Sequence, residues 1–164
     1  MQTKNQELDQ PSRTFEFSEY LEKTTNKNKT VVVEVTLAAS GKPSAVRHAV
    51  KSGLRFTSYL LLKRSLKKRD VDMSQLLGIN PRTLNRRKTA ARFNTEESDR
   101  IVRYAYLQDA AIQLFEGDES RALQWLDRPF TLLGNESPLV HANTEVGAKE
   151  VEKLIGRLEH SVFS

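Results

Sequence analysis

The chain has 164 residues, enough for one domain or two small ones, of which 38% are hydrophobic and 29% charged. Only seven glycines and five prolines occur, which excludes a collagen-like or wholly disordered chain and favours helix. The longest apolar run, Tyr59–Leu62, is far shorter than the roughly 20 residues that span a bilayer. The polar N-terminus has no apolar segment of the kind found in signal peptides, and there is no cysteine. These features predict a soluble, cytoplasmic protein.

The net charge of +5 is unevenly distributed along the chain. Residues Lys42 to Arg103 contain 16 lysines and arginines against 5 aspartates and glutamates, a local net charge of +11. The remaining residues have 10 basic against 16 acidic side chains, a net charge of −6. Such asymmetry indicates two surfaces with different partners, the basic one suited to a polyanion. The alternative is that the basic residues only solvate helix faces.

The first 42 residues are interpreted as a partly flexible N-terminal arm. Residues Met1 to Lys29 are mostly polar, whereas Thr30–Leu37 is rich in β-branched residues and predicts one short extended segment. A lone strand in a helical chain has no internal partner, so its counterpart in a second subunit is one candidate.

From Pro43 onward the apolar spacing predicts helices only. The pattern predicts an all-α fold in which a helix-turn-helix bundle (43–94) is joined by a connecting helix (95–118) to a small C-terminal helical domain (119–164). Local signals at the helix ends support this division. They are Pro43 and Gly53 around the first helix, Gly78 after Val71–Leu77, Asn80 with Pro81, Asn94 with Glu97 before a helix to about Glu116, Gly117-Asp118 before Glu119–Leu126, and Thr144 before the last helix. Residues Arg128 to Pro138 are predicted to form a loop.

Residues Val71 to Lys88 have the pattern of a helix-turn-helix, which needs two short helices joined by a tight turn. Gly78 suits the turn, and Ser74 is small enough to let the helices approach. The shared apolar core is predicted to consist of Met73, Leu77, Ile79 and Leu84.

The second helix of this motif is the candidate nucleic-acid reader. Its predicted exposed residues are Arg82, Thr83, Asn85 and Arg86, followed by Arg87 and Lys88. Arginine pairs with guanine edges and asparagine with adenine, while Arg87 and Lys88 could reach phosphates. Arg87 stands where such motifs usually have an apolar residue, so either its stem packs while its head reaches out, or Phe93 supplies the contact. The alternative is a helix pair that packs this way without binding nucleic acid.

No pattern in the chain indicates an enzyme. His48, His141 and His160 are far apart and have no metal-ligand spacing, and no nucleophile or phosphate-loop motif is present. The pair Glu96-Glu97 is explained by the dipole of the helix that it begins. We therefore expect no catalytic residues, no metal and no cofactor.

The C-terminal part is acidic, and its lone Trp125 is interpreted as a core residue. Gly147 and Gly156 interrupt a good helical pattern, which costs helix stability and indicates close approach of another surface. That surface is either a partner or another part of the same chain.

Several motifs, spread over most of the chain, resemble the Xre/MbcA/ParS antitoxins. The resemblance covers about Pro43 to Phe163 and includes the helix-turn-helix and the helix start Thr95–Ile101. Further along it includes Trp125-Leu126, Pro129, Leu133-Gly134, Pro138-Leu139, Glu145-x-Gly147 and Gly156–His160. Two positions depart from the family pattern, since Asn135 and Ser161 stand where glycines are usual.

This resemblance implies an antitoxin of a type II toxin–antitoxin system. Its C-terminal domain would bind and neutralise a RES-domain toxin that degrades NAD or transfers ADP-ribose, and its helix-turn-helix would bind the promoter of its own operon. The implied toxin-binding residues are Arg157, Glu159, His160, Ser161, Val162 and Phe163. They would lie at the entrance of the toxin's NAD pocket, where Arg157 could occupy space meant for the dinucleotide.

Helix-turn-helix proteins normally read two half-sites, so at least a homodimer is expected on DNA. Two alternatives remain open at this point. One is a stand-alone transcriptional repressor whose acidic half only dimerises. The other is an interaction module whose basic half binds RNA or an acidic protein.

Overall fold

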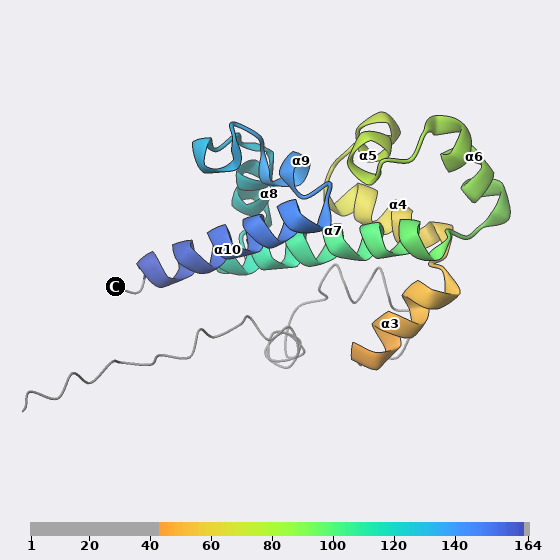
Figure 1. Cartoon of the computed structure of the whole chain (residues 1–164), viewed down its shortest axis with the longest axis horizontal. Helices are drawn as coiled ribbons and strands as arrows, with labels where there is room; N and C mark the ends of the chain where they lie inside the picture. Colours follow the sequence, from red (N-terminus) through yellow and green to blue (C-terminus); the bar gives the residue numbers. More distant parts are fainter. Residues whose placement is uncertain (1–42, 163–164) are drawn as a thin grey trace, which may run out of the picture.

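The computed structural model describes the backbone of residues 43–162 and the side chains of residues 46–159. This part is all-helical (Figure 1), which confirms the predicted fold class. The elements are α3 (Pro43–Ser52), α4 (Phe56–Ser65), α5 (Asp70–Leu77), α6 (Pro81–Ala90), α7 (Thr95–Leu114), α8 (Glu119–Asp127), the 3-10 helix η1 (Thr131–Leu133), α9 (Pro138–His141) and α10 (Glu145–Val162). The extended segment predicted at Thr30–Leu37 lies outside the described residues. None of the helices described is both long and apolar enough to cross a bilayer.

The predicted helix ends coincide with the capping groups that the sequence indicated. The side chain of Asn80 accepts a hydrogen bond from the Thr83 N–H at 2.8 Å, with Pro81 as the first helical residue. Asn94 and Glu97 form a reciprocal capping box at the start of α7. Gly78 ends α5 in the left-handed conformation, with φ of 59°.

The segment predicted as a loop between α8 and α10 is more structured than expected. It contains η1, and α9 begins at Pro138 with the Ser137 side chain as its cap. Ser137-Pro138 is the same local signal as Asn80-Pro81. A four-residue helix is too short to show apolar periodicity, and the pattern therefore gave no sign of it.

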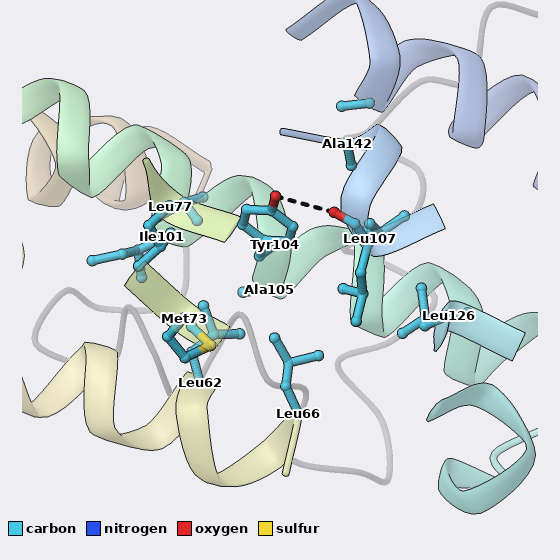
Figure 2. Close-up of a cluster of buried hydrophobic side chains, with 14 of the residues drawn as sticks. Leu62, Leu66, Met73, Leu77, Ile101, Tyr104, Ala105, Leu107, Leu126 and Ala142 are labelled. Carbon is cyan, nitrogen blue, oxygen red and sulfur yellow. Dashed lines mark hydrogen bonds between the residues drawn. The ribbon is translucent and has the colours of Figure 1, made fainter. Parts of the chain in front are cut away.

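The long helix α7 is the axis of the molecule (Figure 1). It packs against α3, α4 and α5 of the helix-turn-helix part and against α8 and α10 of the C-terminal part. Its fully buried residues include Ile101, Tyr104, Ala105 and Ala111, which lie in one continuous apolar core. Figure 2 shows the first three among the other buried side chains. The two halves of the chain are therefore built on one shared helix.

Polar contacts also join the two halves. The Tyr104 hydroxyl contacts the Leu76 carbonyl of α5 and the Leu139 carbonyl of α9, the second contact drawn in Figure 2. On the surface, Lys68 after α4 forms an ion pair with Asp127 at the end of α8. These contacts fix the helix-turn-helix relative to the C-terminal helices.

Candidate nucleic-acid and partner interfaces

The turn between α5 and α6 is fixed by a hydrogen bond from α7. Arg100 of α7 donates from Nη1 to the Leu77 carbonyl at 2.7 Å, directly before the turn residue Gly78. The four residues predicted as the shared core of the motif are all buried, and Ser74 is buried with them. They are Met73, Leu77, Ile79 and Leu84. The helix-turn-helix is thus a packed unit with its turn fixed by a residue from a later helix.

Helix α6 turns a basic face to solvent. Four charged or polar residues of this helix are exposed: Arg82, Asn85, Arg86 and Lys88. Thr83 is half-buried with its N–H bound to Asn80. Arg82 and Arg86 make no hydrogen bond or ion pair with any described residue, so their guanidinium groups are available to a ligand. Because positions i and i+4 share a helix face, these two arginines lie on the same side of α6.

Arg87 differs from its neighbours on this helix. Its side chain is only 20% exposed, and its guanidinium faces the carboxylate of Glu97, which is 7% exposed. The Nη2 of Arg87 donates to Oε1 at 3.0 Å, and its Nε lies 2.6 Å from Oε2. The head group therefore lies inside the α6–α7 junction and does not reach out toward solvent as a phosphate contact would.

Phe93, the other candidate for the missing apolar contact, lies in the core. It is 3% exposed and stacks on Phe56 with ring centroids 5.6 Å apart, close to Tyr59. The position held by an apolar residue in similar motifs is thus occupied here by a paired arginine, with Phe93 packed nearby in the α4–α7 core.

An acidic residue next to the basic helix is paired with a lysine. Asp70, the first residue of α5, accepts hydrogen bonds from the Tyr59 hydroxyl at 2.6 Å and from Lys63 Nζ at 2.8 Å. These bonds, Lys63 first, hold the pKa of the Asp70 carboxyl below its ordinary value, and Lys88 of α6 adds to the effect. The carboxylate thereby anchors the corner between α4 and α5 while remaining charged.

In the C-terminal part, His141 at the end of α9 bridges two carboxylates. Its Nδ1 lies 2.8 Å from Glu136 Oε2, and its Nε2 lies 2.6 Å from Glu150 Oε2. Both ring nitrogens can donate only in the imidazolium form, so hydrogen bonding to Glu150 and then Glu136 raises the pKa of His141 above its ordinary value. This bridge ties the segment before α9 to the second turn of α10.

The two glycines inside the last helix have different surroundings. A Cβ on Gly147 would lie 1.9 Å from the His141 carbonyl oxygen, so this glycine allows α9 and α10 to approach closely. A Cβ on Gly156 would meet nothing within 4 Å among the described residues. Packing among the described residues explains the first glycine and not the second.

One departure from the family pattern has a conformational explanation. Asn135 adopts φ of 63°, directly after Gly134 at φ of 66°. This left-handed region favours glycine, and asparagine is among the residues that tolerate it best. The turn is therefore built with an asparagine at the position where the resemblance leads us to expect a glycine.

Five of the six residues predicted to bind a toxin belong to the last turns of α10, namely Arg157, Glu159, His160, Ser161 and Val162. Arg157 is exposed and Glu159 half-buried. His160, Ser161 and Val162 belong to the helix, although their side chains are outside the described set, and Phe163 lies beyond the described residues. The structure thus places the helical ones in one segment, separated from α6 by the length of α7 (Figure 1).

Three residues that position these surfaces were missed by sequence reasoning. Arg100 holds the turn, Tyr104 joins the two halves, and Glu97 pairs with Arg87 in addition to capping α7. Of these three, only Glu97 could have been inferred from the sequence, because an arginine at a normally apolar position needs an acidic partner nearby. The other two contact backbone carbonyls, which leave no trace in the sequence.

Both the helix-turn-helix part and the C-terminal part match known protein domains. Residues 45–106 match the antitoxin Xre-like helix-turn-helix domain, and residues 110–160 match the antitoxin Xre/MbcA/ParS C-terminal toxin-binding domain. An "Antitoxin Xre" of Yersinia enterocolitica is 51% identical over 88 residues, which are 53% of this chain and 60% of that protein. An "Antitoxin Xre" of Photorhabdus laumondii subsp. laumondii is 40% identical over 94 residues, 57% of this chain and 64% of that protein. The matched region thus spans less than two thirds of the length of these relatives. The chain belongs to the Xre/MbcA/ParS antitoxin family, with an Xre-like helix-turn-helix domain followed by the family's C-terminal toxin-binding domain.

Proposed function

We propose that this protein is an antitoxin that neutralises a cognate RES-type, NAD-consuming toxin and represses its own operon. DNA would be bound by the helix-turn-helix part (43–94) and the toxin by the C-terminal part (119–164), with residues 95–118 connecting them. One observation carries the proposal. The long helix α7 connects a basic, exposed α6 to a toxin-binding domain of this family. Both partners are expected in the cytoplasm.

The exposed chemistry of α6 supports the DNA half of the proposal. Arg82 and Arg86 offer two guanidinium groups on one helix face, with Asn85 beside them, a combination suited to guanine and adenine edges in the major groove. Lys88 would contact phosphate, and Thr83 would lie at the edge of the contact surface. The local excess of basic residues supplies affinity for the phosphate backbone. Two copies of the chain would read two half-sites about 34 Å apart.

The end of α10 supports the toxin half. A glycine inside a helix costs about 1 kcal/mol relative to alanine, and no described residue near Gly156 requires it. Close approach of a partner at this point would give it a role. We therefore propose that the toxin contacts Arg157, Glu159 and the following residues His160, Ser161, Val162 and Phe163. A cationic Arg157 near the toxin's NAD pocket would compete with the dinucleotide.

Co-expression with the toxin tests this assignment. The toxin would be the RES-type protein encoded beside this gene, and cellular NAD and growth would be measured with the full chain or with residues 157–164 deleted. We expect the full chain to preserve NAD and growth and the deletion variant to lose both. The deletion variant must keep its DNA affinity as a check on folding. Full protection by a folded deletion variant would exclude the tail as the inhibitory element.

A further inference from the structure

The side of α6 that faces α7 contains an arginine where an apolar residue is usual. We propose that the buried pair Arg87–Glu97 is a positioning device that fixes the orientation of α6 for reading DNA sequence, and that Arg87 does not itself contact DNA. This inference rests on the proposed DNA-binding function. It gives Arg87 and Lys88 different roles, although residue spacing alone suggests that both contact phosphates.

The geometry of the pair restricts rotation as well as distance. The Nη2 of Arg87 donates a hydrogen bond to Glu97 Oε1 at 3.0 Å, and the Nε of Arg87 lies 2.6 Å from Oε2 in an ion pair that lacks the alignment of a second hydrogen bond. One directed hydrogen bond combined with a close ion pair restricts the relative orientation of its partners more than an apolar contact does. An apolar residue at this position would fill the space without fixing the angle.

The acid is itself held rigidly. Glu97 Oε2 accepts the Asn94 N–H at 2.9 Å, and the Asn94 side chain accepts the Glu97 N–H at 2.8 Å. The carboxylate is therefore locked at the start of α7. Through Arg87, the last turns of α6 are fixed to this locked point.

The position of Arg87 on the helix argues against a direct DNA contact. It lies one turn from the buried Leu84 and the half-buried Thr83, on a different side from the exposed Arg82 and Arg86. Releasing Arg87 toward a phosphate would leave the Glu97 carboxylate buried without its partner, which is strongly unfavourable. DNA binding through the outer face of α6 leaves the pair intact.

The consequence concerns specificity. Contacts of arginine and asparagine to base edges depend on the angle of the helix in the groove, whereas phosphate contacts tolerate small rotations. Loss of the pair is therefore expected to weaken binding to the specific site and to leave non-specific binding unchanged.

The test uses the double variant Arg87→Met/Glu97→Gln in the full chain. The glutamine side-chain carbonyl introduced at position 97 could still accept the Asn94 N–H, so the capping box is kept while the buried charges are removed. Lys88→Met, at the neighbouring position, is the matched control. Affinity is measured over a series of salt concentrations for the DNA upstream of the gene and for a scrambled fragment of equal length, below the unfolding temperature of each variant.

We expect the double variant to lose about tenfold in affinity for the upstream fragment, with unchanged affinity for the scrambled one and an unchanged salt dependence. Lys88→Met should weaken both and lower the slope of log K against log salt by about 0.9. The inference is overturned, and the proposed function is not, if the double variant keeps the wild-type ratio of the two affinities or behaves like Lys88→Met. If the wild-type chain does not prefer the upstream fragment, the proposed function fails and the inference fails with it.

Discussion

The hydroxyl of Tyr104 lies 3.1 Å from the carbonyl oxygen of Leu139, joining the middle of α7 to the first turn of α9 (Figure 2). The same hydroxyl lies 3.0 Å from the Leu76 carbonyl at the end of α5. Burial raises the pKa of Tyr104 above its ordinary value, so the hydroxyl keeps its hydrogen at any physiological pH. One buried side chain thus contacts both the helix-turn-helix and the toxin-binding part.

Tyr104→Phe removes the hydroxyl without changing the ring. We expect it to lower the free energy of unfolding by about 1–2 kcal/mol, because the carbonyls of Leu76 and Leu139 lose the one hydroxyl hydrogen that they share. Unfolding should remain a single transition in the variant, since the core that runs along α7 is continuous. Urea denaturation followed by circular dichroism and by Trp125 fluorescence measures both quantities. Two separate transitions in the wild type would contradict a shared core.

The two glycines of α10 form a matched pair for mutation. Gly147→Ala should destabilise the fold by about 2 kcal/mol or more, because its Cβ would overlap the His141 carbonyl oxygen. Gly156→Ala should stabilise it by about 1 kcal/mol, because the new methyl group meets open space in a helix.

Toxin binding tests whether Gly156 serves an interface and not the stability of the helix. If a partner approaches α10 at Gly156, the stabilised Gly156→Ala protein should nevertheless bind the toxin more weakly. Thermal unfolding and calorimetric titration of the same samples give both values. A Gly156→Ala variant that is more stable and binds with wild-type affinity would place the interface elsewhere.

The His141 bridge predicts a pH dependence of stability. Its pKa is raised in the folded protein, so the imidazolium between Glu136 and Glu150 stabilises the fold fully below the ordinary pKa near 6.5. This contribution is lost as pH rises through the higher folded-state pKa. The difference in melting temperature between the wild type and His141→Gln should therefore be largest at acidic pH, while the two glutamates are still ionised, and should shrink above about pH 6.5. A difference that grows with rising pH would contradict the bridge.

The local elements of this fold could be predicted from the sequence because their signals are local. Asn80, Asn94 and Gly78 each act within one helical turn, and each is found at the predicted helix end. The α9 helix shows the limit of such signals, since Ser137-Pro138 caps it but its four residues are too few for a periodic pattern.

The candidate site was predictable in part for a related reason. Helical spacing identified the exposed Arg82 and Arg86, yet it gave Arg87 and Lys88 the same phosphate-binding role, because the contact of Arg87 depends on a carboxylate ten residues away. The Tyr104 contacts bridge 28 and 35 residues of sequence and depend only on how the helices pack. Tertiary contacts of this kind have no counterpart in residue spacing.

Separation of the two activities tests the central claim most directly. The double variant Arg82→Ala/Arg86→Ala and the variant lacking residues 157–164 would each be assayed for affinity to the upstream DNA and for neutralisation of the toxin. If opposite ends of α7 serve different partners, the arginine variant should lose DNA affinity by about tenfold or more while still neutralising the toxin. The truncated chain should show the reverse pattern. Loss of both activities in either folded variant, or of neither, would contradict the assignment of DNA to α6 and of the toxin to the end of α10.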